Sequence, residues 1–268
     1  MLDIILEEFH FSSLWNGGIF LLLSFAAIIY LFLLPHDQRH TIWKSLLYLA
    51  GLIILFIGIG SPINIIGRIE FSTHIIQIIL LLYVAPPLLL LGFKQKPLEK
   101  LLSLSFFHHI VKILSHPILT IGLFYLLLYG YHLPAVFDHA RIELYANYFY
   151  MLGLFISAIL LWIPLLSQNI LTVTQKTLYS VLNIMLIVPF SLALWLINES
   201  LYTVYTDMTT FVASMELCLP PGETLSPEYF AMLLPFYPIG EQKQGGMMLL
   251  ISQLIIFVSV ILISRVKR

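Results

Sequence analysis

The sequence has very little charge for its length. Only 10% of its 268 residues are Asp, Glu, Lys or Arg, whereas 60% are apolar. A water-soluble domain of average composition is about 25% charged and about 45–50% apolar. There is too little charge to cover the surface of a soluble domain of this size, which excludes a cytoplasmic enzyme, a nucleic-acid-binding protein and a disordered chain. The composition indicates a polytopic membrane protein.

Cysteine and catalytic motifs are also scarce. The single cysteine, Cys218, excludes an internal disulfide and a cysteine-rich zinc or iron–sulfur site. No HExxH, GxSxG or phosphate-binding GxxxxGK[ST] motif is present, so we expect no enzymatic activity. The last apolar segment has no lysine for a retinal Schiff base. Almost no ionisable residue falls at mid-membrane depth, which weighs against an ion-coupled pump or transporter.

Long apolar runs dominate the sequence instead. A helix needs about 20 mostly apolar residues to cross the hydrocarbon core of a bilayer. The runs are continuous and do not alternate with period two, which favours helices over a barrel. The sequence therefore predicts an all-α fold, with one transmembrane domain over residues 1–268 and seven transmembrane helices near residues 15–34, 45–61, 72–92, 118–134, 146–166, 180–197 and 247–264.

Basic residues are unevenly distributed among the predicted loops. The first, third and fifth loops and the C-terminal tail together hold ten Lys and Arg, whereas the other loops hold three. Because cytoplasmic loops carry the excess of Lys and Arg, we expect the N-terminus outside and the C-terminus in the cytoplasm. The acidic N-terminal segment has no basic n-region, so we expect no cleaved signal peptide.

The longest predicted loop, residues 200–246, lies on the outer side and carries its own helix signals. Thr206-Asp207 is typical of an N-cap before a short helix ending near Leu217. Ser226-Pro227-Glu228 is a second start signal, placed before an apolar run that ends at Leu234. We expect two short interfacial helices that lie on the membrane or over the mouth of the bundle.

Two histidines are predicted at the same depth. His74 opens the third predicted helix, which runs inward, and His132 closes the fourth, which runs outward, so both lie near the outer boundary. Asp138 follows His132, while Met215 and Cys218 are three residues apart in the long loop. Imidazole, thiolate and thioether suit copper, and the sulfur ligands select Cu(I). The sequence thus indicates a metal site at His74, His132, Asp138, Cys218 and Met215.

A packing explanation of the same residues stays open. His74 and His132 would then form a hydrogen bond across helices, and Met215 and Cys218 would pack beneath the loop.

Several short segments, in order over most of the chain, are shared with a known family. They are Ser61-Pro62, Phe71–Gln77, Ala85–Gly92, Tyr131–Pro134 with Phe137-Asp138, Trp162–Leu165, Met215–Pro220 and Gln244–Gly246. In these segments the sequence resembles the CtaG family of cytochrome c oxidase assembly factors, of the seven-helix bacterial type. The segment Met215–Cys218 resembles the Bacillus-like branch of that family.

The resemblance implies a multi-pass protein of the bacterial plasma membrane that is needed for active haem–copper oxidase. The implied partners are the lipid bilayer and cytochrome c oxidase subunits, with copper as the ligand that the protein delivers or inserts, and no nucleic acid. His74, His132, Asp138, Glu216 and Cys218 match family positions. Many members carry further histidines where this chain has Ile78, Tyr145, Tyr148 and Tyr150. A site built from several histidines is therefore depleted here.

A copper or small-solute transporter is the alternative function. A transporter needs a polar pathway to both faces of the membrane. The inner halves of the predicted helices are almost purely apolar, which favours the assembly factor.

Overall fold

The computed structural model describes residues 9–35, 40–219 and 237–266, and this part of the chain contains helices and no strand. The elements in order are α2 (Phe11–Leu14), α3 (Gly17–Ile28), the π-helix η1 (Ile29–Leu33), α4 (Ile42–Gly60), α5 (Pro62–Ile69), α6 (Phe71–Ile79), the π-helix η2 (Leu80–Val84), α7 (Ala85–Gly92), α8 (Gln95–Leu102), α9 (Ser105–Leu114), α10 (Pro117–Tyr131), α11 (Pro134–Ile142), α12 (Leu144–Leu166), α13 (Val173–Leu196), the 3₁₀-helix η3 (Thr203–Tyr205), α14 (Met208–Glu216) and α16 (Pro238–Val266).

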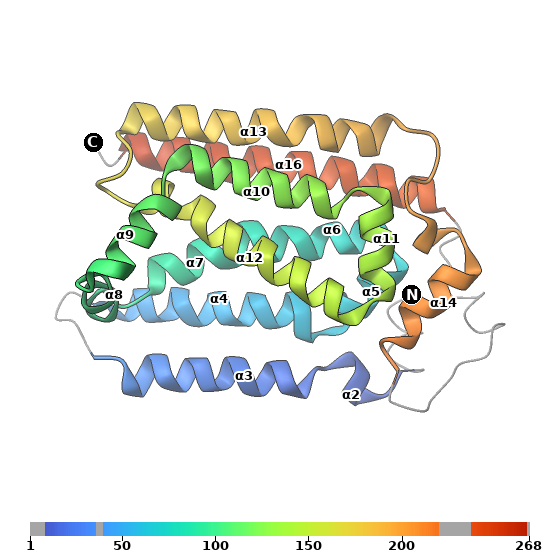
Figure 1. The fold of residues 1–268 in the computed structure, drawn as a ribbon, viewed down its shortest axis with the longest axis horizontal. Helices are drawn as coiled ribbons and strands as arrows, with labels where there is room; N and C mark the ends of the chain where they lie inside the picture. The colour runs from blue at the N-terminus through green and yellow to red at the C-terminus, as the bar shows by residue number, and fades with distance from the viewer. Residues whose placement is uncertain (1–8, 36–39, 220–236, 267–268) are drawn as a thin grey trace.

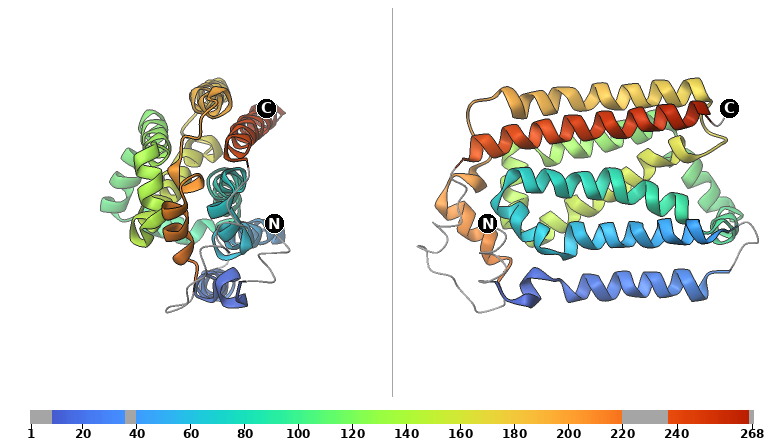
Figure 2. Two further views of the ribbon diagram at one scale, coloured as in Figure 1. Left: turned by 90° about the vertical axis from the view of Figure 1, so that its right-hand side faces the viewer. Right: turned by 180° about the vertical axis from the view of Figure 1, so that it is seen from behind.

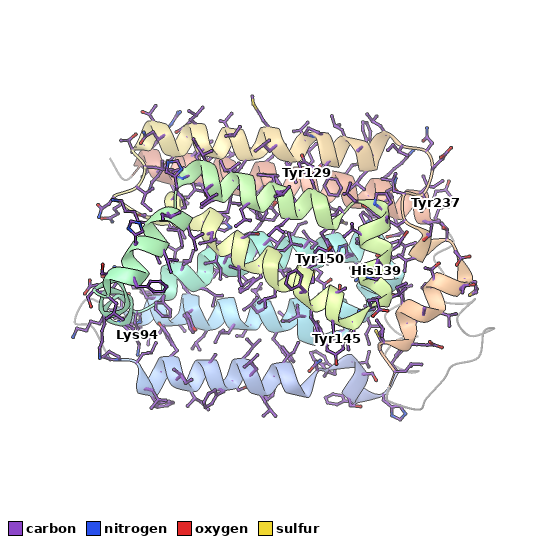
Figure 3. All side chains as sticks on the ribbon, in the orientation of Figure 1. Lys94, Tyr129, His139, Tyr145, Tyr150 and Tyr237 are labelled. Atoms are coloured by element: carbon purple, nitrogen blue, oxygen red, sulfur yellow. The ribbon has the colours of Figure 1, made fainter. Side chains whose placement is uncertain are left out.

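The long helices lie side by side and form one bundle with two ends (Figure 1). Helices α5, α11 and α14 lie at one end, which we call the α14 end, and α8 and α9 lie at the other, the α8 end. In Figure 3, His139 marks the α14 end and Lys94 the α8 end. Figure 2 shows α3 at the edge of the bundle in both of its views.

Five helices of the described chain are long and apolar enough to cross a membrane. They are Ile42–Gly60, Phe71–Gly92, Leu144–Leu166, Val173–Leu196 and Pro238–Val266. The pair α10 and α11, bent by 73°, adds a sixth if it is one span, and the apolar helix Gly17–Leu33 is shorter. The protein is therefore a multi-pass membrane protein. Seven crossings and their orientation stay predictions.

All seven predicted segments lie on helices, and most of these helices begin within three residues of the predicted start, but α13 begins seven residues earlier and α16 nine residues earlier. Helix α13 begins at Val173 because Thr172 caps it: its side chain accepts from the Gln175 amide, and the Gln175 side chain accepts from the Thr172 amide. Helix α16 begins at Pro238, since proline is well suited to the first turn of a helix.

Several of the segments between the long helices also form helices. Ser61 caps α5 and Pro62 occupies its first turn, while Pro134 occupies the first turn of α11. The predicted short helix after Asp207 is confirmed as α14, because the Asp207 carboxylate accepts from the Thr210 amide at 2.9 Å. The second predicted short helix, at residues 226–234, lies outside the described residues.

A proline in the third span leaves a backbone carbonyl free to accept a hydrogen bond from another helix. Pro86 has no N–H, so the Leu82 carbonyl in η2 loses its partner within the helix. The indole Nε1 of Trp162 on α12 donates to that carbonyl at 3.1 Å. A backbone group freed inside the membrane is thereby satisfied by a neighbouring helix.

Helices α13 and α16 make close contact at Gly246. A Cβ atom at this position would lie 2.7 Å from the Ser191 carbonyl oxygen and 2.9 Å from the Leu194 Cβ. Small residues of this kind let membrane helices approach closely.

We expect Gly246→Ala to lower the free energy of unfolding by about 1–3 kcal/mol, the cost of overpacking a close contact. The matched control is Gly122→Ala on α10, where nothing lies within 4 Å of the added Cβ. Thermal unfolding of the purified variants in detergent is the measurement. Equal unfolding temperatures for the two variants would contradict the close contact.

Candidate functional site: a buried histidine pair

The break between α10 and α11 positions His132. Pro134 disfavours the helical conformation of the residue before it, and Leu133 is accordingly extended, with φ −61° and ψ 131°. The chain therefore turns by 73° between the two helices. His132 lies at this turn, at the α14 end of α10.

His74 lies in the first turns of α6 and meets His132 there. The two imidazole rings have centroids 5.7 Å apart, and the side chains are 0% and 4% exposed. The sequence-based expectation that these rings approach each other is confirmed. They lie among four aromatic rings, those of Phe71, Tyr131, Phe137 and Phe190.

The hydrogen bonds of His74 define its tautomer. Its Nδ1 lies 3.3 Å from the Gln77 Oε1. The Gln77 Nε2 donates to the Gly58 carbonyl at 2.7 Å, and because a carbonyl only accepts, the orientation of the Gln77 amide is set. Gln77 Oε1 is then an acceptor, so His74 carries its proton on Nδ1. Its Nε2 has a free lone pair.

His132 has the same arrangement. Its Nδ1 lies 2.8 Å from the Leu128 carbonyl oxygen, which can only accept, so Nδ1 carries the proton. The Nε2 atoms of both histidines are buried and have no hydrogen-bond partner in the described chain. Each Nδ1 bond stays within one helix, so the alternative of a hydrogen bond between the two histidines across helices is wrong. A metal-binding histidine has this pattern, one nitrogen held by an acceptor and the other left free.

The Asp138 carboxylate forms hydrogen bonds with η3. Its carboxylate accepts from the Thr203 amide at 3.0 Å, from the Thr203 hydroxyl at 2.7 Å and from the Val204 amide at 3.1 Å. It thereby fixes η3 against α11, and Tyr202 beside it donates to the His132 carbonyl at 3.1 Å. Asp138 therefore holds the segment that contacts His132 rather than contacting the histidine pair itself.

Met215 and Cys218 lie in a second apolar cluster at the α14 end. Met215 is completely buried with Ile65, Ile69 and Phe211, and Cys218 packs against this cluster. Burial raises the pKa of the Cys218 thiol, although the charges of Arg68 and Arg141 oppose the shift. The thiol is therefore protonated at neutral pH. No group of three or more His, Cys, Asp and Glu side chains with metal-ligand geometry occurs among the described residues.

Of Tyr145, Tyr148 and Tyr150, one packs against the aromatic rings around the histidine pair. Tyr145 and Tyr148 are 84% and 52% exposed. Tyr150 packs on Tyr131, with ring centroids 5.8 Å apart, and lies on α12 with Tyr145 (Figure 3).

Two buried arginines next to this site are residues that the sequence analysis missed. Arg68 on α5 and Arg141 on α11 were counted there as loop residues, but they are only 3% and 2% exposed. The signal was available. Each arginine lies in a short apolar stretch that follows a proline start signal, Pro62 or Pro134, and such a stretch predicts a packed helix.

The arginines connect three elements through backbone carbonyls. Arg68 Nη1 donates to the Arg141 carbonyl at 2.7 Å and to the Ser214 carbonyl at 3.1 Å. Arg141 Nη2 donates to the Gly67 carbonyl and to the Tyr205 hydroxyl, while Tyr205 itself donates to the Gly67 carbonyl at 3.0 Å. These bonds hold α5, α11 and α14 together above the histidine pair.

The comparisons with known proteins decide the family. A family model described as "Cytochrome c oxidase caa3 assembly factor (Caa3_CtaG)" matches residues 27–267, nearly the whole chain. The chain belongs to this family. Its resemblance in the shared segments is thereby confirmed, and cytochrome c oxidase is the target that the family indicates. No curated protein and no solved structure matches the chain.

Membership of the Caa3_CtaG family gives the histidine pair its context. His74, His132 and both arginines lie within the matched residues. An assembly-factor family suggests a non-catalytic role.

Proposed function

We propose that this member of the Caa3_CtaG family supports oxidase assembly by holding Cu(I) between His74 and His132 at the outer face of the membrane. The observation that carries the proposal is the pair of buried Nε2 atoms, each with a free lone pair and no partner among the described residues. A buried acceptor without a partner costs about 1–3 kcal/mol, so two of them on adjacent rings need a ligand to offset that cost.

The charge around the pair favours a monovalent ion. Both ligands are neutral imidazoles, and the described chain places no carboxylate group beside them as part of a metal cluster. The nearby guanidinium groups of Arg68 and Arg141 repel cations, and this repulsion is twice as large for a divalent ion. Imidazole suits copper, and Cu(I) has the lowest charge among the copper ions.

Copper titration of the purified protein tests this proposal. We expect wild-type protein to bind one equivalent of Cu(I) in competition with a Cu(I) chelator, and His74→Ala and His132→Ala to lose this binding. His139→Ala is the matched control because that histidine is exposed on α11. Cys218→Ser and Met215→Leu distinguish the pair from the larger ligand set, since both variants keep full affinity if the histidines suffice. Wild-type affinity in both histidine variants would reject the site.

The outer location rests on the predicted orientation, which cysteine labelling tests. In a Cys218→Ser background we expect a cysteine at Ser103, in the loop between α8 and α9, to be shielded from an impermeant thiol reagent in intact cells. A cysteine at Glu199, after α13, is expected to be labelled; both positions are exposed in the structure. Labelling at Ser103 alone would reverse the orientation.

A further inference from the structure

We infer that the α14 end contains a binding site for a glycerophospholipid, with the phosphate on Arg68 and Arg141 and an acyl chain in the cavity below them. The cavity has a volume of about 690 Å³ and both arginines line it. This volume lies within the range of about 300–1,000 Å³ that is typical of ligand sites. The inference does not depend on copper binding.

The two buried positive charges of the site favour the binding of an anion. Two guanidinium groups are buried side by side, and neither has a carboxylate partner among the described residues. Their hydrogen-bond acceptors are carbonyl and hydroxyl groups. The Nε atom of each arginine is buried and donates to nothing in this part of the chain. Buried ions are costly unless they are paired. Guanidinium groups match phosphate because they donate two parallel hydrogen bonds to it.

The lining of the cavity changes from polar to apolar along the bundle. Toward the α14 end it is lined by Asn16, Asn64 and Asn147, and further along the helices by Leu81, Leu152 and Phe155. On α12 the lining residues extend from Leu144 to Phe155, which is about 16 Å at 1.5 Å per residue. A phosphate with a hydrocarbon chain fits this gradient, whereas free phosphate would leave the apolar part empty.

Exposed lining residues on α3 and α12 place the opening of the cavity, where a lipid would enter, on the side of these two helices. Leu22 on α3 and Tyr148 and Leu152 on α12 line it and are 65%, 52% and 59% exposed. Helix α3 lies at the edge of the bundle (Figure 2).

Cys218 reports on occupancy, since it lines the cavity and is the single cysteine of the chain. We would measure its alkylation by iodoacetamide in purified wild-type protein, with phosphatidylglycerol, diacylglycerol or inorganic phosphate added at the same concentration. Phosphatidylglycerol at about ten times its Kd is expected to slow alkylation roughly ten-fold, because only unoccupied protein reacts. Diacylglycerol and inorganic phosphate are expected to leave the rate unchanged.

Two pairs of variants test the acyl-chain part and the phosphate part of the site separately. Leu152→Trp obstructs the apolar part and should remove the protection, whereas Ile156→Trp, on the same helix, half exposed and outside the cavity, should retain it. Arg68→Gln should also remove protection and Arg265→Gln should not; if Arg68→Gln fails to fold, the tryptophan pair decides. The inference is overturned if diacylglycerol protects as well as phosphatidylglycerol, if inorganic phosphate alone protects, or if no lipid protects.

Discussion

A strain whose only copy of this protein carries His74→Ala is expected to have at least about ten-fold lower cytochrome c oxidase activity when copper is limiting. Loss of one of two ligands lowers copper affinity, and occupancy at limiting copper falls with it. Oxidase subunits should still be synthesised, because the defect concerns the metal. Added copper should restore part of the activity by mass action. Activity in membranes and subunit amount on immunoblots are the measurements.

The same strain background supplies the control. His139→Ala changes an exposed histidine on α11 and should leave activity unchanged at every copper concentration. Full activity of His74→Ala and His132→Ala at limiting copper would exclude copper binding by the pair as the basis of assembly. An activity loss that added copper does not relieve would point to a structural role instead.

Gln77→Leu is expected to weaken Cu(I) binding by roughly 10–100-fold, the usual cost of removing a partner that orients a metal-binding histidine. Gln77 Oε1 holds the proton of His74 on Nδ1. Without it the proton is free to move to Nε2 and block the lone pair, although both rings remain. Competition with a Cu(I) chelator measures the affinity.

Gln253→Leu is the matched control for this substitution. Gln253 is also a fully buried glutamine, but it lies on α16, away from the histidine pair. Its replacement should leave copper affinity unchanged. Equal affinities of the two variants would contradict a positioning role for Gln77, and a Gln77→Glu variant, which keeps an acceptor beside Nδ1, should retain more affinity than leucine.

The sequence was sufficient to predict the long helices and the histidine pair, because both depend on patterns that are local. Apolar runs locate the spans, and the direction of the chain places His74 and His132 at one end. The arginines were missed because the count of basic residues in loops treats every one as solvent-exposed. Arg68 and Arg141 are buried. The count of basic residues in the predicted outer loops therefore includes two residues that lie inside the protein.

The predicted metal ligands show a second limit of prediction from sequence. Asp138 is close to His132 along the chain, yet its three hydrogen bonds go to Thr203 and Val204. Met215 on α14 and Cys218 just after this helix are close to each other along the chain, yet they pack on α5. Spacing along the chain identifies residues that share an element, but only the packing of different elements decides which of them meet.

Gly67 contacts both Arg141, of the arginine pair, and His74, of the histidine pair. Its carbonyl accepts from Arg141 and Tyr205, and a Cβ on its other side would lie 3.2 Å from the His74 Cα. A ligand that moves α5 against α6 therefore alters the arginine and histidine pairs together. If the proposed copper and lipid both bind and are coupled in this way, thermodynamic reciprocity makes each change the affinity of the other by the same factor. In that case Gly67 would be the residue through which membrane composition affects metal loading.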